Sequence, residues 1–150
     1  MATYLQKGYS KEWINQRIKT IEVRKVLTDE WNGVGISKQE DFAILTDELT
    51  KAWSGKSVKE YKRFKDLKKE NLRDNMTNLE LVLNMLAEVS TKELSNKKNP
   101  ETFIESKEIA NNGGSVAKIA KDKLESQLGE EVVNNKNAKE IHFNKNKKLK

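Results

Sequence analysis

The sequence predicts an all-α protein, a compact bundle of about five or six short to medium helices followed by a mobile basic C-terminal tail. Three observations predict it. Lys, Glu, Leu and Ala recur while there is a single proline, Pro100, so residues that favour helices dominate. Apolar residues return at spacings of three and four, which is the helical period. Capping signals and glycines divide the chain into short segments with short connections.

The first predicted helix runs from about residue 11 to residue 31. Ser10 precedes it, and a serine in this position satisfies free amide groups of the first turn. Gly33 and Gly35 follow it, and glycine readily adopts the left-handed conformation that ends helices. The apolar residues at helical spacing are Ile14, Ile18, Ile21, Leu27 and Trp31.

Two capping boxes predict the next two helices. In such a box a Ser hydroxyl and a Glu three residues later satisfy each other's free amides. Ser37 with Glu40 opens a helix that Gly55 ends, and Ser57 with Glu60 opens a shorter one. The apolar residues are Phe42, Leu45, Leu49 and Trp53 in the first helix and Val58, Tyr61 and Phe64 in the second.

A third capping box, Thr77 with Glu80, opens the helix with the clearest apolar pattern. Such a stripe is typical of a core-facing helix, although it also suits the pairing of two chains. The predicted stripe comprises Leu79, Val82, Leu83, Leu86 and Val89, widened by Leu81 and Met85.

Two short helices are predicted to complete the bundle. Asn99 and Pro100 are interpreted as a cap and a first-turn proline, and Gly113 with Gly114 as the turn between the helices. Gly129 closes the last one. The apolar residues are Phe103, Ile104 and Ile109 in the first, and Val116, Ile119, Leu124 and Leu128 in the second.

The chain is expected to form one helical domain over residues 1–133, with a basic tail over 134–150 that is rich in Lys and Asn and has no sustained period. The absence of cysteine excludes disulfides and thiolate metal sites and favours a reducing compartment. No apolar run is long enough to span a bilayer, and no signal peptide is recognisable. A cytoplasmic protein without a membrane partner is therefore expected.

Charge is distributed in blocks, which matter more than the net charge of +6. Two of the basic blocks, 51–73 and the tail, are expected to face phosphates, and the alternative is that the acidic blocks pair with the basic ones, within the fold or between chains. Counting Lys and Arg against Asp and Glu gives +4 for residues 1–27, −5 for 28–50, +6 for 51–73, −4 for 74–135 and +5 for 136–150.

Long runs of the chain resemble the C-terminal region of prophage antirepressors that begin with a Bro-N domain. These runs are YLQKGYSKEWINQRIKTIEVRKVLTDEW, DFAILTDELTKAWSGKSVKEYKRFKDLKKENLRDNMTNLELVLNMLAE and NPETFIESKEIANNGGSVAKIAKDKLE. DNA-damage-inducible protein D shows a looser version of the same order. The resemblance covers roughly Tyr4 to Val133. The Bro-N domain, which contacts DNA in the family, is not among these 150 residues, so its DNA recognition is not carried over.

The resemblance implies a non-enzymatic regulatory module, DNA-linked, acting in transcription regulation or the SOS response through non-specific nucleic-acid contact and through protein partners. A repressor or a recombinase is the kind of protein partner that it implies. The alternative is a protein-interaction or self-association module without direct DNA binding, forming homo-oligomers. Some members of the family are described as toxin–antitoxin components. The family supplies no catalytic residues for this region.

The strongest candidate surface is the basic segment between residues 56 and 73. Basic residues three and four apart share a helix face, and a line of positive charge gives salt-sensitive affinity for phosphates. Tyr61 and Phe64 would then stack on unpaired bases. The alternative is a solvated face with both aromatic residues in the core. The predicted nucleic-acid-binding residues are Lys56, Lys59, Lys62, Arg63, Lys65, Lys68, Lys69 and Arg73.

Other positively charged or turn-forming segments have weaker signals. The turn over residues 111–115 suits a plain helical hairpin better than a DNA-reading turn or a phosphate-holding helix start. The tail is interpreted as a solubilising end or a loose grip on a nucleic-acid backbone. Its lysines are Lys136, Lys139, Lys145, Lys147, Lys148 and Lys150. At least two of the large anchors Trp13, Trp31 and Trp53 are expected in the core, with an interface as the alternative.

Catalysis has weak support in the sequence, and neither a cofactor nor a metal is expected. The single histidine, His142, lies in the predicted tail, where nothing fixes its geometry. Adjacent carboxylates on a helix point in different directions and do not by themselves define a metal site. The pairs in question are Asp29–Glu30, Glu40–Asp41 and Asp47–Glu48.

Overall fold

The computed structural model describes residues 8–136, and the regular secondary structure among them is helical, with no strand. The prediction of an all-α bundle is therefore confirmed for this part of the chain. Five α-helices and one 3-10 turn follow in the order α2 (Lys11–Gly33), α3 (Gln39–Ser54), α4 (Val58–Phe64), η1 (Arg73–Asn75), α5 (Asn78–Lys98) and α6 (Phe103–Leu128).

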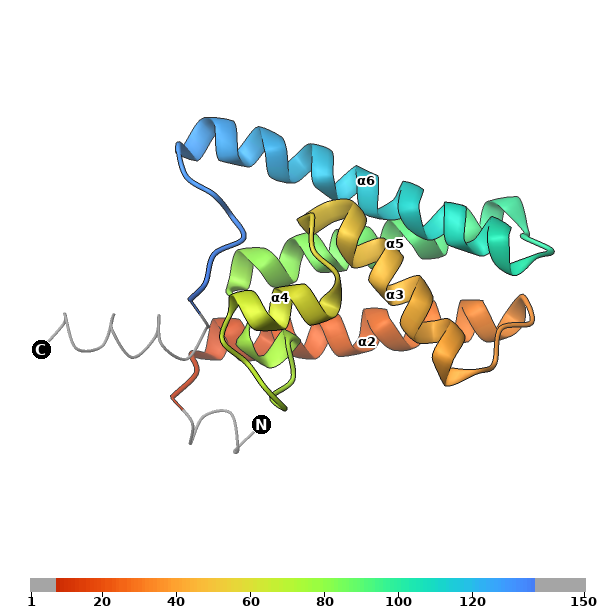
Figure 1. The fold of residues 1–150 in the computed structure, drawn as a ribbon, viewed down its shortest axis with the longest axis horizontal. Helices are drawn as coiled ribbons and strands as arrows, with labels where there is room; N and C mark the ends of the chain where they lie inside the picture. Colours follow the sequence, from red (N-terminus) through yellow and green to blue (C-terminus); the bar gives the residue numbers. More distant parts are fainter. Residues whose placement is uncertain (1–7, 137–150) are drawn as a thin grey trace, which may run out of the picture.

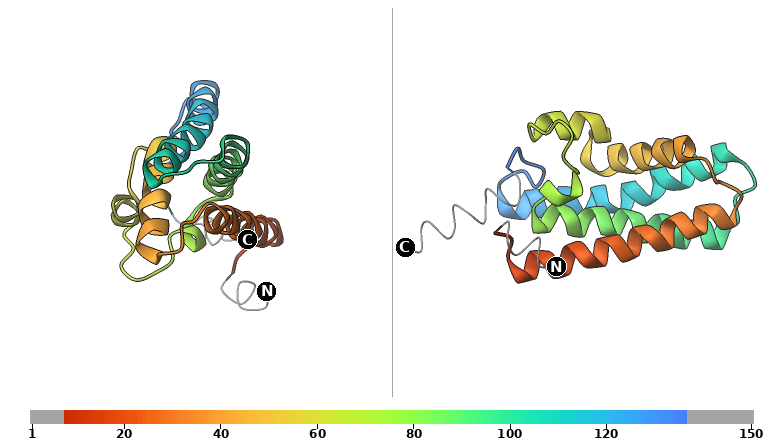
Figure 2. Two further views of the ribbon diagram at one scale, coloured as in Figure 1. Left: turned by 90° about the vertical axis from the view of Figure 1, so that its right-hand side faces the viewer. Right: turned by 90° about the horizontal axis from the view of Figure 1, so that it is seen from below.

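The four long helices lie side by side as a bundle, and α5 is its centre (Figure 1). Helix α5 packs against α2 on one side and α6 on the other, while α3 crosses α6 and also touches α5. The end view in Figure 2 shows α2 and α6 on opposite sides of α5. The short helix α4 and the chain that follows it cover the front of this assembly, beside the beginning of α5.

Three of the five predicted N-terminal caps are present. The hydroxyl of Ser10 accepts a hydrogen bond from the Trp13 amide at 3.1 Å. Both capping boxes, Ser57 with Glu60 and Thr77 with Glu80, are formed in full. At the C-terminal ends of α3 and α6, the predicted glycines adopt the left-handed conformation, as their lack of a Cβ allows.

The predicted capping box at Ser37 is wrong. Helix α3 begins at Gln39, its N-cap is Lys38, and no side chain caps it. The reason lies in the preceding turn. Ile36 is buried, and its amide donates to the carbonyl of Trp31 at 2.9 Å, so the chain reaches the helix later than the Ser-Glu spacing predicts.

The predicted turn at Gly113 and Gly114 is also wrong, because α6 continues through both residues. A Cβ at Gly113 would lie 2.0 Å from Oγ1 of Thr91, and one at Gly114 would lie 2.5 Å from the carbonyl oxygen of Leu49. The two glycines therefore allow α6 to approach α5 and α3 closely. No turn of the DNA-reading kind and no phosphate-holding helix start exists here.

The connection between α5 and α6 differs from the prediction as well. Asn99 ends α5 in the left-handed conformation, with φ of 47°, instead of opening the next helix. Thr102 is the N-cap of α6, and its hydroxyl accepts from the Glu105 amide at 3.1 Å. Pro100 lies in the link, which suits a residue that cannot continue a helix.

The three tryptophans lie in the core, as predicted: Trp13, Trp31 and Trp53 are at most 1% exposed. On α5, however, the predicted stripe is partly wrong, because Val82 and Val89 are 37% and 40% exposed. The buried face of α5 is largely polar. Its buried residues are Glu80, Leu81, Leu83, Asn84, Ala87, Glu88, Thr91 and Ser95.

None of the helices in the described range is both long and apolar enough to cross a membrane. Val132 and Val133 are buried, near the end of that range. His142 and all tail lysines after Lys136 lie outside the described residues.

Candidate functional site

Two adjoining cavities open between α2, α3, α4 and the chain leading to α5, and together we call them the cationic cleft. The inner cavity has a volume of about 250 Å³ and the outer one about 650 Å³. They lie side by side, because four residues line both: Arg24, Thr46, Val58 and Lys62. Helices from opposite sides of the bundle therefore contribute to one hollow.

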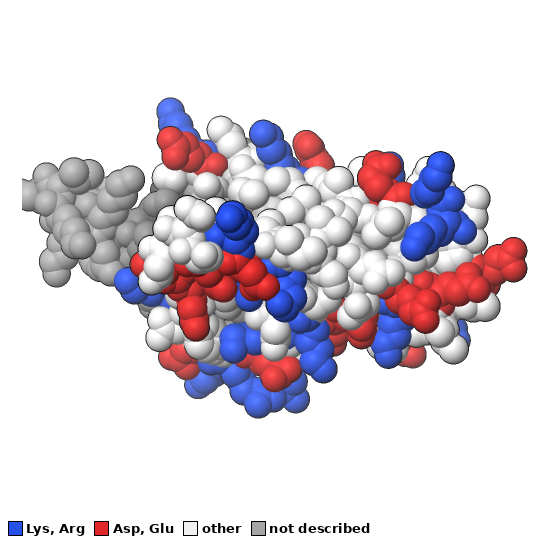
Figure 3. Space-filling model, turned by 90° about the horizontal axis from the view of Figure 1, so that it is seen from above, with Lys and Arg blue, Asp and Glu red and all other residues white. Residues whose placement is uncertain are grey.

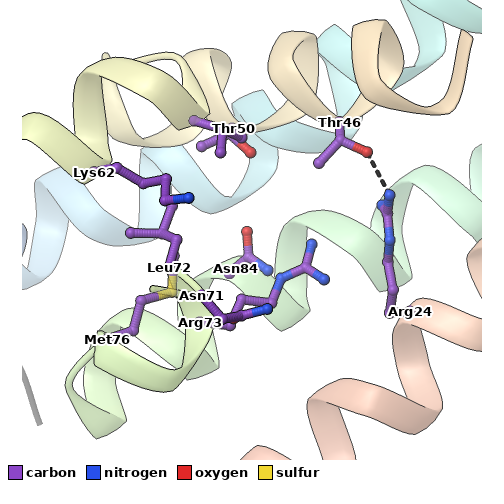
Figure 4. Close-up of a pocket in the computed structure, with 10 residues that line it drawn as sticks. Arg24, Thr46, Thr50, Lys62, Asn71, Leu72, Arg73, Met76 and Asn84 are labelled. Carbon is purple, nitrogen blue, oxygen red and sulfur yellow. Dashed lines mark hydrogen bonds between the residues drawn. The ribbon is translucent and has the colours of Figure 1, made fainter. Parts of the chain in front are cut away.

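Two arginines in the wall of the inner cavity share one buried carboxylate, which does not itself line the cavity. Arg24 and Arg73 each place a guanidinium nitrogen 3.1 Å from Oε2 of Glu88. The Glu88 side chain is fully buried, whereas the two arginines keep about a fifth of their side-chain surface exposed, at 21% and 19%. Both guanidinium groups therefore face the cavity as well as the carboxylate (Figure 4).

Neutral polar groups hold this cluster in place. The Asn84 amide donates to the other oxygen of Glu88 at 3.3 Å and accepts from the Trp53 indole at 3.2 Å. Arg24 also donates to the hydroxyl of Thr46 at 2.5 Å, drawn as the dashed line in Figure 4. The cluster thus links α2, α3, α5 and η1.

Electrostatics disfavour the charge on Arg24. Burial lowers the pKa of its guanidinium, the nearby Glu88 carboxylate raises it, and the neighbouring Arg73 lowers it further; the net effect is a pKa below the usual 12.5. An arginine remains charged under all ordinary conditions. A positive charge that is incompletely compensated therefore stands at the wall of the cavity.

Lys62 adds a third cation and lines both cavities. Its side chain extends from α4 toward the centre of the inner cavity (Figure 4). Among the described residues, no carboxylate forms an ion pair with it. The exposed Glu70 carboxyl interacts with Lys62 at longer range. Its pKa is lowered mainly by backbone hydrogen bonds, and more weakly by the positive charges of Lys62 and Lys68.

The outer cavity is more exposed and more strongly basic. Lys59, Arg63 and Lys68 line it together with Arg24 and Lys62. One carboxylate, that of Asp47, also lies in its wall, where an oxygen accepts from the Val58 amide at 3.0 Å. Apolar side chains complete the wall, namely Ala43, Val58 and Leu67. Figure 3 shows basic side chains gathered at the edge of the molecule where α4 lies.

The structure divides the eight predicted basic residues. Five of them line the cationic cleft: Lys59, Lys62, Arg63, Lys68 and Arg73. The other three do not. The Lys56 ammonium lies 4.4 Å from the centre of the Phe64 ring, and Lys69 is exposed but lines neither cavity.

Lys65 is the clearest departure from the predicted basic surface. Its ammonium is buried and lies 2.7 Å from Oε1 of Glu80. The Tyr61 hydroxyl donates to the other oxygen of Glu80, and its ring is fully buried. Stacking of a base on Tyr61 is therefore wrong as a prediction, and Tyr61 belongs to the core. Phe64 is 38% exposed.

The prediction missed Arg24, which belongs to a helix distant in sequence from the basic segment. A signal for it does exist in the sequence. Arg24 shares one face of α2 with Leu27 and Trp31, which follow it by three and seven residues and are both buried. An arginine on a buried helix face needs a partner, and the partner here is Glu88.

Within residues 8–136, no three His, Asp or Glu side chains gather in a way that would hold a metal ion. Two members of the acidic pairs on α2 and α3 form hydrogen bonds between helices. Glu30 accepts from Ser95 at 3.1 Å, and Glu48 accepts from Asn111 at 3.1 Å.

The cationic cleft thus brings charge, cavity and polar groups together in one part of the described chain. The likeness to prophage antirepressors rests on the sequence runs quoted above. Comparison with protein-family models, with curated proteins and with solved structures finds no match for this chain.

Proposed function

We propose that this chain is a non-enzymatic regulatory module that holds nucleic acid by its phosphates along the cationic cleft. One observation carries the proposal. Lys59, Lys62, Arg63 and Lys68 line one cavity with Arg24, against the single carboxylate of Asp47. Because Arg24 is already paired with Glu88, the other four cations set against Asp47 leave an excess of three positive charges at one solvent-accessible hollow.

Such an arrangement favours a polyanion over a neutral ligand. Each lysine or arginine that contacts a phosphate releases a condensed counterion, and this release drives binding without regard to base sequence. All of the contacts except Arg24 come from α4 and the chain after it, and we expect them to follow the backbone of a strand. Base stacking contributes little, because Tyr61 is buried and Phe64 carries Lys56 over its ring.

The regulatory setting follows from the resemblance to prophage antirepressors and to DNA-damage-inducible protein D. In that setting the module adds non-specific affinity for DNA, and a repressor or recombinase is its protein partner. The residues of the cationic cleft support the first part of this proposal, the non-specific affinity for DNA.

Binding of labelled single-stranded and double-stranded DNA, followed by fluorescence anisotropy at several salt concentrations, tests the proposal. The decisive variant is Lys59→Gln with Lys68→Gln, because both side chains are exposed and form no ion pair within the described chain. The slope of log affinity against log salt is expected to fall by about 0.7 for each lost contact on a single strand and about 0.9 on a duplex.

A matched control removes the same charge elsewhere. Lys97 and Lys98 are exposed at the far end of α5, away from α4 (Figure 1), and changing both to Gln should leave the slope as it is. If the control variant and the cleft variant weaken DNA binding equally, the affinity results from the net charge of the chain, and the cleft has no specific role. If the affinity does not change with salt concentration, contact with the phosphates is refuted.

A second candidate function is a protein-interaction module, favoured by the outer face of α6. Ile104 and Ile119 on this helix are 71% and 72% exposed, and Figure 3 shows a broad uncharged area on this side of the molecule. Exposed apolar patches of this kind mark contact sites for proteins. Sedimentation of the chain and of Ile119→Gln tests self-association: a monomer at every concentration counts against pairing through α6.

A further inference from the structure

In the inner cavity, two guanidinium groups share one carboxylate, and the Lys62 ammonium adds a third positive charge to the same wall. We propose that the inner cavity binds one phosphoryl group, presented as a phosphate monoester by a nucleotide-sized molecule or by the end of a nucleic-acid strand. This site shares Arg24 and Lys62 with the outer cavity, and it differs from the strand contacts proposed above because it takes a terminal phosphate. For a strand end the inference rests on the proposed function; for a free nucleotide it does not.

The charge balance of the inner cavity specifies the ligand. Arg24, Arg73 and Lys62 contribute three positive charges, and Glu88 contributes one negative charge, which leaves an excess of two. A phosphate monoester carries about 1.5 to 2 negative charges at neutral pH, whereas each phosphate diester inside a strand carries one. The monoester is therefore the better match to this cavity.

The donor geometry points the same way. A guanidinium presents a planar fork of N–H groups that matches phosphate oxygens, and its hydrogen bonds to an anion are about twice as strong as neutral ones. Figure 4 shows Lys62, Thr50, Asn84 and Arg73 arranged around one space, with Arg24 at its far side. Thr50 and Asn84 are buried polar side chains in this wall.

The outer cavity accommodates the remainder of the molecule. Its volume of about 650 Å³ lies inside the range of about 300–1,000 Å³ typical of pockets for small organic ligands. Ala43, Val58 and Leu67 give it apolar surface, and its lysines and arginines surround that surface. A nucleoside monophosphate therefore places its phosphate inward and its nucleoside outward.

Titration calorimetry of the full chain tests this site with inorganic phosphate, adenosine 5′-monophosphate and adenosine. The two phosphates are expected to bind and to compete with each other, whereas adenosine does not bind. Affinity should decrease as the pH is lowered through about 6, where a monoester loses its second charge. Equal binding of adenosine and its monophosphate overturns the proposal, as does the absence of any binding by either phosphate.

Three variants locate the site. Lys62→Gln is expected to weaken monophosphate binding by about tenfold or more, the usual loss for one hydrogen bond to a charged group, and Thr50→Val by a smaller factor. Lys69→Gln is the matched control, because Lys69 is exposed in the same segment and lines neither cavity. Equal effects of Lys62→Gln and Lys69→Gln place the phosphate outside the inner cavity and refute the proposal.

A last pair of ligands separates this site from the strand contacts. Single strands with and without a 5′-phosphate are compared, together with the Lys59→Gln/Lys68→Gln variant. A strand end in the inner cavity makes the phosphorylated strand bind more tightly, and Thr50→Val reduces that advantage. Strand binding without monophosphate binding refutes the inner site alone. Monophosphate binding without strand binding refutes the proposed function alone.

Discussion

The Lys65 ammonium lies 2.7 Å from a carboxylate oxygen of Glu80, and both side chains are completely buried. The same oxygen accepts from the Thr77 amide at 3.0 Å, as the capping box requires. The other oxygen accepts from Tyr61. Glu80 therefore caps α5 and, at the same time, holds α4 and the chain after it against the bundle.

Lys65→Met is expected to destabilise the fold by about 3–5 kcal/mol, because it leaves the buried Glu80 carboxylate without its opposite charge. Urea unfolding followed by circular dichroism measures the change. The double variant Lys65→Met/Glu80→Gln removes both charges and should lose clearly less than the sum of the two single variants. Additive losses would show that the two groups do not interact.

Tyr61 should make stability depend on pH in the alkaline range. Burial raises the pKa of its hydroxyl well above the usual 10, and the negative charge of Glu80 and the hydrogen bond to it raise it further. Above pH 10 the unfolded chain releases this proton while the folded chain keeps it, so unfolding becomes easier as pH rises. The neutral Tyr61 thus contributes stability below pH 10 that is lost above it, by about 1.4 kcal/mol per pH unit.

Unfolding by urea at several pH values between 8 and about 11, the range around an ordinary tyrosine pKa, measures this loss in the wild-type chain and in Tyr61→Phe. The variant lacks the proton in question and should show a shallower decline. Parallel declines of the two proteins would contradict the assignment to Tyr61, because the remaining lysines and tyrosines contribute to both curves equally.

The capping boxes at Ser57 and Thr77 could be predicted from sequence because each depends on residues within one turn. The face that α5 buries could not. Apolar spacing predicted Val89 inside, whereas Glu80 and Glu88 are inside. A glutamate is usually at the surface unless paired, and the partners here come from segments that a local pattern does not connect.

Only part of the cationic cleft could be predicted from the sequence, because its residues come from segments that a local pattern does not connect. The basic segment identifies Lys62 and Arg73, but only the fold brings Arg24 next to them. Sequence spacing also placed Lys65 with the exposed lysines, although it faces Glu80. Burial separates lysines that a charge count treats alike.

Glu88→Gln should destabilise the fold by about 3 kcal/mol, the lower end of the range for a broken buried ion pair, since Arg24 and Arg73 keep contact with solvent. Glu93→Gln on the same helix is the control: this side chain is 67% exposed and, within residues 8–136, its one ion pair is with Lys92. Its loss should be below about 1 kcal/mol. Similar unfolding midpoints in urea for the two variants would show that Glu88 does not hold the arginines.

Gly113→Ala should destabilise the bundle, although Ala in a helix is ordinarily better than Gly by about 1 kcal/mol. The new Cβ would lie 2.7 Å from the backbone nitrogen of Thr91, so trimming that side chain with Thr91→Ala does not relieve the clash and α6 must move away from α5. Gly33→Ala is the matched control, because nothing lies within 4 Å of its Cβ position in α2. Thermal unfolding should show a lower midpoint for Gly113→Ala and an unchanged or higher one for Gly33→Ala. If Gly113→Ala is as stable as the control, or if Thr91→Ala restores it, α6 does not lie against α5 at the separation that brings these backbones together.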